Sequence, residues 1–174
     1  MIKKLSAIAL LWVALTAPVK SDAAHHASMS STAVYSLSPG LAFAGGWVGM
    51  SFNSVIGVAP ISGHEFYIGA DLSFDLYLPS AVVINLGILP TAWYQFRLPR
   101  SPHIRLVGGL ALGPAVMIGG TAGGIGSGVA LEFLFRPGFL IDMSDATLFG
   151  VDLKIGSVNG VFVFKPTANF VFAF

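Results

Sequence analysis

The chain has 174 residues, of which 55% are hydrophobic and only 10% are charged, against about a quarter charged in a typical soluble domain. It contains no cysteine and its mean hydropathy is +0.80. These values exclude a disulfide scaffold, a cysteine-ligated metal site and a charged disordered tail, and they predict one domain embedded in a membrane.

The N-terminal segment is predicted to be a cleaved secretory signal. Lys3 and Lys4 precede an apolar run over residues 5–17, and residues 21–23 place Ser-Asp-Ala at a cleavage site. The run is shorter than the ~20 residues of a transmembrane helix, so a first membrane helix is the weaker interpretation. Removal of residues 1–23 takes away three of nine bases and one of eight acids, and the nearly neutral remainder has no basic patch for nucleic acid.

Residues 24–31 are expected to form a short spacer. If cleavage follows Ala23, the free amine of Ala24, two backbone amides and the His26 imidazole could enclose Cu(II) or Ni(II) in a square plane. Cleavage one residue later would destroy that arrangement, and a flexible spacer is the simpler interpretation. We therefore assign no metal site and predict no cofactor.

The pattern of the following segments decides between transmembrane helices and a barrel, the two structures that satisfy every backbone amide inside lipid. Over residues 65–78 the odd positions hold three carboxylates, whereas every even position is apolar. A helix would spread the carboxylates around its circumference, but a strand places them on one face opposite an unbroken apolar row. Residues 82–98, 129–142 and 149–155 alternate in the same way, so the pattern predicts strands.

Turn signals rich in glycine, proline and serine divide the mature chain into eight predicted strands. The predicted strands are residues 32–44, 47–59, 64–78, 81–98, 103–118, 127–141, 147–156 and 161–174. Each reaches the ~9–11 residues with which a tilted strand crosses lipid. The predicted fold is therefore all-β, an eight-stranded antiparallel up-and-down transmembrane β-barrel over residues 32–174.

A helical alternative rests on residues 106–131, which carry no charge. Glycines in this stretch recur at four-residue spacing, as in close-packed helix pairs. Pro114 and paired glycines interrupt the stretch, and the segments on both sides alternate as strands. A helical membrane bundle is thus the alternative fold.

The last predicted strand alternates phenylalanine with polar residues and ends in phenylalanine. Its apolar face holds Phe162, Phe164, Phe170, Phe172 and Phe174, and its polar face holds Lys165, Thr167 and Asn169. This pattern resembles the C-terminal signal of bacterial outer-membrane β-barrels, and the mature chain is similar to the small eight-stranded barrels of the OmpA and OmpX type. The resemblance implies the outer membrane of a Gram-negative bacterium and recognition of Phe170, Phe172 and Phe174 by the barrel-assembly machinery.

In such a barrel the polar strand faces point into the lumen, where ten charged residues are expected. They are the acids Glu65, Asp71, Asp75, Glu132 and Asp152 and the bases Arg97, Arg105, Arg136, Lys154 and Lys165. Because an unpaired buried charge is costly, this balanced set predicts an ion-pair network. A pore or proton path is the alternative, but eight strands leave room only for side chains, so no open channel is predicted.

Candidate loop and catalytic sites are sparse. If both termini lie in the periplasm, the outer turns at 45–46, 79–80, 119–126 and 157–160 carry no charge, which disfavours a loop-based receptor. His64 beside Glu65 is the nearest histidine and carboxylate pair, but neighbours in a strand point to opposite faces, so no catalytic residue is assigned.

The sequence thus predicts a small integral outer-membrane protein with a structural or interaction role and no enzymatic activity. A narrow pore or transporter for a small apolar ligand and a lipid-modifying enzyme are the alternatives. The expected partners are outer-membrane lipids and the barrel-assembly machinery, without nucleic acid, and the protein is expected to be a monomer or weak oligomer.

Overall fold

The computed structural model describes residues 33–61, 64–78, 82–121 and 124–174. The signal predicted for residues 1–23, the spacer of residues 24–31 and His26 lie outside the described residues.

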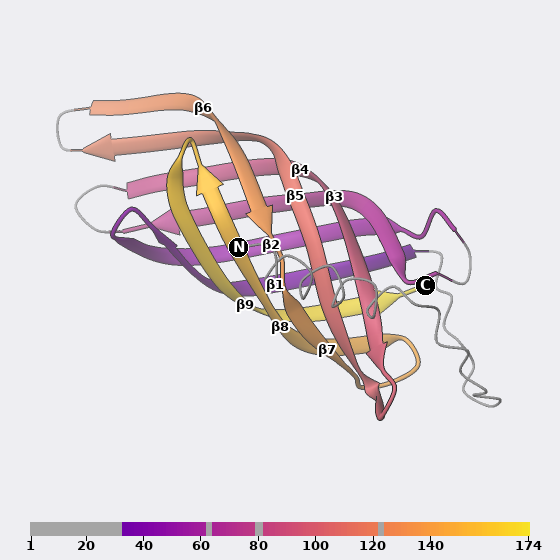
Figure 1. Ribbon diagram of the computed structural model, residues 1–174. Helices are drawn as coiled ribbons and strands as arrows, with labels where there is room; N and C mark the ends of the chain where they lie inside the picture. Colours follow the sequence, from indigo (N-terminus) through magenta and orange to yellow (C-terminus); the bar gives the residue numbers. More distant parts are fainter. Residues whose placement is uncertain (1–32, 62–63, 79–81, 122–123) are drawn as a thin grey trace, which may run out of the picture.

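The described chain forms one antiparallel sheet that closes on itself (Figure 1). Its elements are β1 (Ala33–Ala44), β2 (Trp47–Val58), β3 (Phe66–Tyr77), β4 (Val82–Leu98), β5 (Ser101–Thr121), β6 (Gly124–Phe135), β7 (Gly138–Asp142), β8 (Thr147–Val158) and β9 (Val161–Ala173). Apart from β6 and β7, strands that follow one another in the chain are paired, and β9 closes the ring by pairing with β1. Because β6 and β7 together occupy one position between β5 and β8, the ring has eight strands, and the predicted barrel is confirmed.

The predicted strand 127–141 is divided by Pro137. Proline has no N–H to donate to a ladder, and β6 therefore ends before it while β7 begins after it. The wall nevertheless continues, because Arg136 exchanges backbone hydrogen bonds with Gly109 and the carbonyl of Pro137 accepts from the N–H of Leu153.

The stretch 106–131 is a β-hairpin, so the helical alternative is wrong. The ladder between β5 and β6 runs from Leu110 opposite Phe135 to Thr121 opposite Gly124. The turn predicted for residues 119–126 is therefore too long, because Gly119, Gly120 and Gly126 are paired across the two strands. Within the described ranges, no helix has the length and apolar character needed to span a membrane.

The two ends of the barrel differ in their turns. We call the end that holds Ala33 and Phe174 the base, where these two residues exchange backbone hydrogen bonds. The turns from β2 to β3, β4 to β5 and β7 to β8 also lie at the base. The opposite end, here called the tip, has two-residue turns after β1 and after β8, and their residues adopt positive φ: Gly45 and Gly46 in the first, Asn159 and Gly160 in the second. These are the dipeptides that tight hairpins favour.

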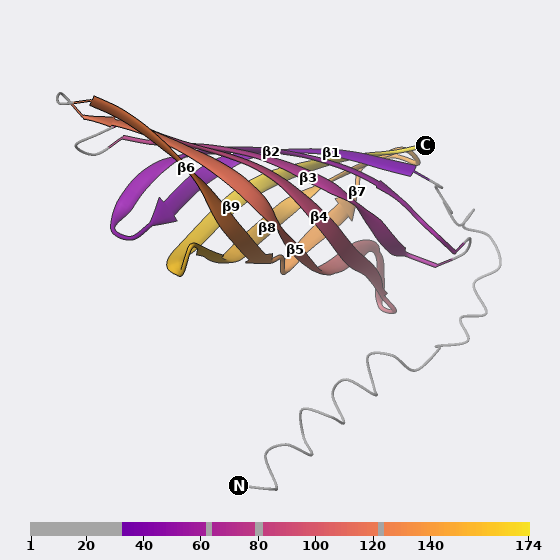
Figure 2. The ribbon, with the colours of Figure 1, turned by 90° about the horizontal axis from the view of Figure 1, so that it is seen from above.

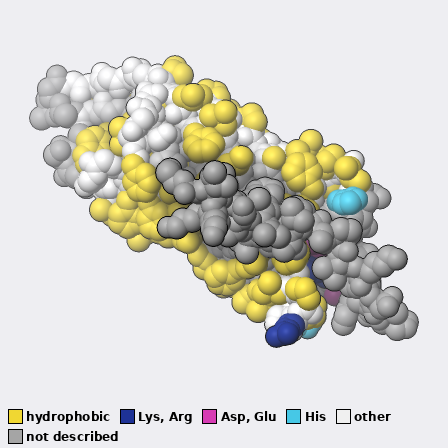
Figure 3. Space-filling view, viewed as in Figure 1, with side chains coloured by type: hydrophobic (Ala, Val, Ile, Leu, Met, Phe, Trp, Pro, Cys, Tyr) yellow, Lys and Arg dark blue, Asp and Glu magenta, His cyan; other side chains and the backbone are white. Residues whose placement is uncertain are grey.

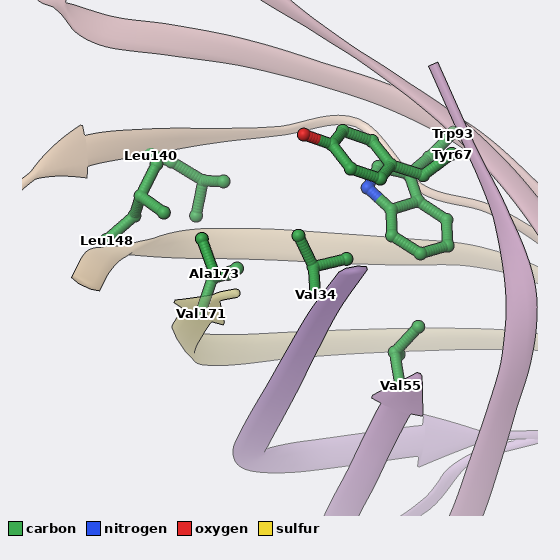
Figure 4. Packing of buried hydrophobic residues seen from close by; sticks show 8 residues of the cluster. All are labelled: Val34, Val55, Tyr67, Trp93, Leu140, Leu148, Val171 and Ala173. Atoms are coloured by element: carbon green, nitrogen blue, oxygen red, sulfur yellow. The ribbon is translucent and has the colours of Figure 1, made fainter. Parts of the chain in front are cut away.

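Side chains alternate between an apolar outer wall and a mixed interior. In Figure 3 hydrophobic side chains dominate the visible wall, and Lys or Arg side chains are seen at one extremity only. Inside the base, eight buried side chains from seven elements pack into one apolar layer (Figure 4). The members of this base layer are Val34, Val55, Tyr67, Trp93, Leu140, Leu148, Val171 and Ala173. The stacked rings of Tyr67 and Trp93, with centroids 5.4 Å apart, are its largest part.

Candidate functional site

The inward positions of the strands collect the charged side chains in the interior, and every one of the ten predicted lumen residues takes part in an ion pair there. Eight of them are buried, namely Asp71, Asp75, Arg105, Glu132, Arg136, Asp152, Lys154 and Lys165. The other two, Glu65 and Arg97, keep side chains 22% and 30% exposed. The pairs form three clusters at successive depths.

The first cluster lies at the base. Glu65 precedes β3, and its Oε1 accepts a hydrogen bond of 2.7 Å from Nε of Arg97 and lies 3.5 Å from Nη1 of Arg105. Nε of Arg105 donates to Oδ1 of Asp142 at 2.7 Å, and its Nη1 donates to Oε1 of Gln95 at 3.2 Å. The two guanidinium groups therefore join β4, β5 and β7 to the residue that precedes β3.

Asp142 is a member of this cluster that the predicted lumen set omits. It is the last residue of β7, and alternation over residues 129–142 puts it on the same face as Glu132 and Arg136. The contact of Asp142 with Arg105 depends on the pairing of β5 with β7, which the sequence does not show. With Asp142 the interior holds six acids against five bases.

The second cluster spans the middle of the barrel. Nζ of Lys154 in β8 donates to Oδ2 of Asp71 in β3 at 2.6 Å, and both side chains are fully buried. Arg136 donates from Nη2 and Nε to Oδ2 of Asp152, at 2.6 and 3.2 Å. Its Nη1 lies 3.6 Å from Asp71, which is an ion-pair distance but too long for a hydrogen bond.

The pair of Lys154 and Asp71 crosses the full width of the interior. In the eight-stranded ring, β3 and β8 are separated by three strands on one side and by the same number of positions on the other, so they are opposite walls. A contact of 2.6 Å between their side chains therefore fills the centre of the lumen. This arrangement agrees with the narrow interior expected of an eight-stranded barrel.

The third cluster lies nearer the tip and has one cation for two carboxylates. Nζ of Lys165 lies 2.6 Å from Oδ2 of Asp75 and 2.5 Å from Oε1 of Glu132. The amide of Asn85 donates to both carboxylates at 3.1 Å, and the hydroxyl of Ser51 donates to Oδ1 of Asp75 at 2.7 Å. These neutral donors help to stabilise the second negative charge.

The base layer lies on the base side of the second and third clusters, and further apolar side chains are interspersed with these clusters toward the tip. The base layer includes Trp93, whose ring centroid lies 5.9 Å from the guanidinium carbon of Arg136. A second apolar group, led by Leu89 and Leu134, is buried on the walls around the upper clusters. In the sequence, such an interior apolar residue is marked by polar residues two positions before and after it, which lie on the same face of the strand. Trp93, between Thr91 and Gln95, is an example.

The predicted assembly signal lies on the outer wall. Phe170, Phe172 and Phe174 are 41%, 36% and 74% exposed. The ring of Phe170 contacts Phe149 with centroids 5.0 Å apart, and that of Phe172 stacks on Tyr35 at 6.5 Å. These phenylalanines thus belong to an aromatic surface that β8, β9 and β1 build together.

Metal ligands and the pair of His64 with Glu65 are the two candidate features to compare with the described interior. Among the described residues, no group of three or more His, Cys, Asp or Glu side chains could hold a metal ion. The carboxylate of Glu65, which follows His64, is engaged by Arg97 and Arg105 instead. The charged side chains of the interior pair with one another.

A closed eight-stranded antiparallel sheet with an ion-paired interior and an apolar outer wall defines the class of small outer-membrane β-barrels. Solved structures of this class are similar to the chain. Neisserial surface protein A superposes with a TM-score of 0.66 at 13% identity, covering 82% of this chain and 96% of its own. The N-terminal β-barrel domain of Pseudomonas aeruginosa OprF gives 0.61 at 12% identity, covering 83% and 98%.

A third similar structure is Ail, the attachment invasion locus protein of Yersinia pestis, with a TM-score of 0.54, 12% identity and coverage of 83% and 97%. Such identities show a shared fold, and the predicted resemblance to small eight-stranded outer-membrane barrels is confirmed at that level. No protein-family model matches the chain, and no curated protein matches it.

Proposed function

We propose that the protein is a small integral protein of a Gram-negative outer membrane, with a plugged barrel that serves a structural or interaction role and conducts no ions. The observation that carries this proposal is the 2.6 Å contact between Lys154 and Asp71, on opposite walls and both fully buried. An ion path along the lumen would have to displace this pair and the apolar base layer below it. Loss of one partner of a buried pair leaves an uncompensated charge, so the pair resists displacement.

The proposed location follows from the outer wall. Large exposed hydrophobic side chains occur on every strand, and such a wall is stable against lipid rather than water. The predicted signal peptide would carry the chain across the inner membrane, and Phe170, Phe172 and Phe174 would then be read by the barrel-assembly machinery. In this orientation the base, with the C-terminus, faces the periplasm and the tip faces the exterior.

A non-catalytic role is part of the proposal. The six interior carboxylates, which include Glu65, Asp71 and Glu132, are each held by a Lys or Arg side chain. A lipid-modifying enzyme needs a nucleophile beside an available base. The engaged carboxylates therefore support a role in packing or association.

Conductance in planar lipid bilayers tests the proposal. The mature protein, refolded and shown to be inserted by heat-modifiable migration on SDS gels, is expected to give no current steps above the bare bilayer. A general porin in the same bilayer is the positive control. Reproducible single-channel steps from the heat-modifiable form would overturn the plugged interior and favour the narrow pore.

A further inference from the structure

The third cluster differs from the other two in its charge. The first and second clusters each balance two carboxylates with two basic side chains. In the part of the chain that the structure describes, the third has only Lys165 for Asp75 and Glu132, and all three residues are 0% exposed. Neutral donors offset part of the surplus but supply no charge. Because a buried charge without a counter-charge is costly, this cluster favours a bound cation.

Two unpartnered oxygen atoms belong to the same cluster. Oδ1 of Asn53 and Oδ1 of Asn85 are buried and have no hydrogen-bond partner among the described residues, and the two residues are 3% and 1% exposed. Nδ2 of Asn85 bridges the two carboxylates. Nδ2 of Asn53 donates to the hydroxyl of Ser51, which in turn donates to Asp75. Since a buried acceptor without a partner is costly, these two oxygens also favour a ligand that is positive or donates.

The second cluster shows which unpartnered atoms a neutral ligand would suit. They are one donor, Nη1 of Arg136, and two acceptors, Oδ1 of Asp71 and Oδ1 of Asp152. A buried water molecule typically makes about three hydrogen bonds to such groups, and the charges of this cluster are already balanced. The third cluster combines surplus negative charge with unpartnered acceptors alone, so a cation suits it better than water.

Gly87 leaves room for a ligand beside the third cluster. It lies on the inner face of β4, two residues after Asn85, and it ends a row of the inner wall in which Asn53 pairs with Ser73 and Ser73 pairs with Gly87. A Cβ atom at Gly87 would lie 3.1 Å from Oε2 of Glu132 and 3.4 Å from Cβ of Ser73. The space therefore holds about one methyl group, which admits a small bare cation and excludes a quaternary ammonium ion.

We propose that the third cluster binds one small monovalent cation, such as Na⁺, in the space beside Gly87. Its ligands are a carboxylate oxygen of Glu132 and the amide oxygens of Asn53 and Asn85, the type of atom that hard cations prefer. One positive charge equals the surplus of the six interior acids over the five bases. A divalent ion does not fit, because no described group of three or more His, Cys, Asp or Glu side chains could hold one.

The barrel wall is incomplete on one side of the tip, close to this cluster. β6 begins at Gly124, but its pairing with β8 starts only at Glu132, opposite Val158. The last contact on this side joins Leu131 to Asn159, whose backbone N–H and side-chain Oδ1 bond the carbonyl and the N–H of Leu131. Above this point the β5–β6 hairpin extends past the β8–β9 hairpin, as Figures 1 and 2 show. This part of β6 has no neighbour on the β8 side among the described residues, and we call it the open edge.

The open edge gives the cation a path from the tip. The inward positions of β6 above Glu132 are Ala130, Gly128 and Gly126, since alternate residues share a face. A Cβ atom added at Gly126 or Gly128 would meet nothing within 4 Å, so the space inside the open edge is free. Toward the base, the second cluster and the base layer fill the lumen. The cation therefore enters and leaves at the tip, and its binding is compatible with a barrel that conducts no ions.

Urea unfolding in detergent micelles tests the cation. A ligand that binds only the folded chain lowers the equilibrium constant of unfolding by the factor 1 + [L]/Kd. At constant ionic strength, maintained with choline chloride, each tenfold increase of NaCl above Kd is thus expected to lower this constant about tenfold. Parallel series with KCl and NH₄Cl identify the preferred ion. Unfolding that is independent of all three ions would overturn the proposal, also where it depends on pH, since a proton would then neutralise the cluster.

Two variants test the position of the site. Gly87→Ala places a methyl group in the proposed space and keeps every charge, whereas Glu132→Gln removes the surplus charge, and both are expected to lose the dependence on NaCl. The control for the first is Gly108→Ala, where a Cβ meets nothing within 4 Å. The control for the second is Asp145→Asn at the exposed β7–β8 turn. Both controls should keep the tenfold change, and a folded Gly87→Ala or Glu132→Gln protein that also keeps it would overturn the proposal.

Discussion

The base and the tip of the same barrel are stabilised in different ways. At the base, an apolar layer and a cluster of two arginines with two carboxylates join all sides of the ring. At the tip, two-residue turns and uncharged glycine-rich strands leave part of β6 without a neighbour. The difference shows that interior contacts can hold the ring of strands together while part of one strand at the tip has no neighbour. It predicts that substitutions near the base and middle cost more stability than substitutions at the tip.

The largest effect is expected from Lys154→Met. The change leaves Asp71 buried, with the guanidinium of Arg136 at 3.6 Å as its remaining ion-pair partner. Breaking a buried pair costs about 3–5 kcal/mol. Urea unfolding in detergent micelles measures the loss. Arg100→Met at the exposed β4–β5 turn is the charge-matched control, expected within about 0.5 kcal/mol of the parent.

The double variant with Asp71→Asn and Lys154→Met sharpens this prediction, because it removes both charges and should recover much of the lost stability. A loss in Lys154→Met no larger than in Arg100→Met would contradict the role of the pair.

A smaller loss is expected from Gly57→Ala in the base layer. The added Cβ would lie 2.1 Å from Cη2 of Trp93, and the stacked ring of Tyr67 limits movement of the indole. Overpacking of this kind costs about 1–3 kcal/mol. Gly108→Ala, where a Cβ meets nothing within 4 Å, is the control, and equal losses in both variants by urea unfolding would refute the packing argument.

Asn159 marks the boundary between the closed wall and the open edge, and Asn159→Gly is expected to cost about 1 kcal/mol. The change keeps the positive φ of 48° accessible but removes the side-chain hydrogen bond to Leu131. A loss of about 1 kcal/mol is typical for one hydrogen bond. Asn159→Ala should cost about 1–2 kcal/mol more, because alanine disfavours that φ. Hydrogen exchange at the Leu131 amide reports the opening, and identical stabilities of the two variants would show that φ does not matter.

The smallest effect is expected at the edge itself. Ile125→Ser in dilute detergent should change the free energy of unfolding by less than about 0.5 kcal/mol, since the side chain is 83% exposed. Leu140→Ala in the base layer, where Leu140 is 2% exposed, should cost about 2–5 kcal/mol. Comparable losses at the two positions would abolish the distinction between base and tip.

The sequence predicted the strands and their faces because alternation is a local property. Residues 65–78 show it without exception, and the structure places their carboxylates inside. Partners across the barrel could not be predicted in this way. Alternation says which face a side chain occupies, whereas the contact of Lys154 with Asp71 depends on the register of every strand between β3 and β8.

The sequence mispredicted the bounds of one turn and one strand, both at glycine or proline residues. Glycine and proline occur in turns and in strands, so their local signals depend on context. Gly119 and Gly126 were expected in a turn, but they face each other in a ladder. Alternation places Tyr67 and Trp93 on the polar faces of their strands, but the apolar layer that they form with side chains from five other strands could not be predicted. The free edge of β6 follows from the short β6–β8 ladder, which only the paired strands reveal.

The link between Lys154 and Asp71 also bears on how long the protein stays folded. The two residues are 83 positions apart and lie on opposite walls, so they meet only after the sheet has curled into a ring. Interactions formed late in folding leave the folding rate unchanged and slow the reverse reaction. Lys154 is therefore expected to lengthen the lifetime of the folded barrel, a protection set by the unfolding rate rather than by the equilibrium stability.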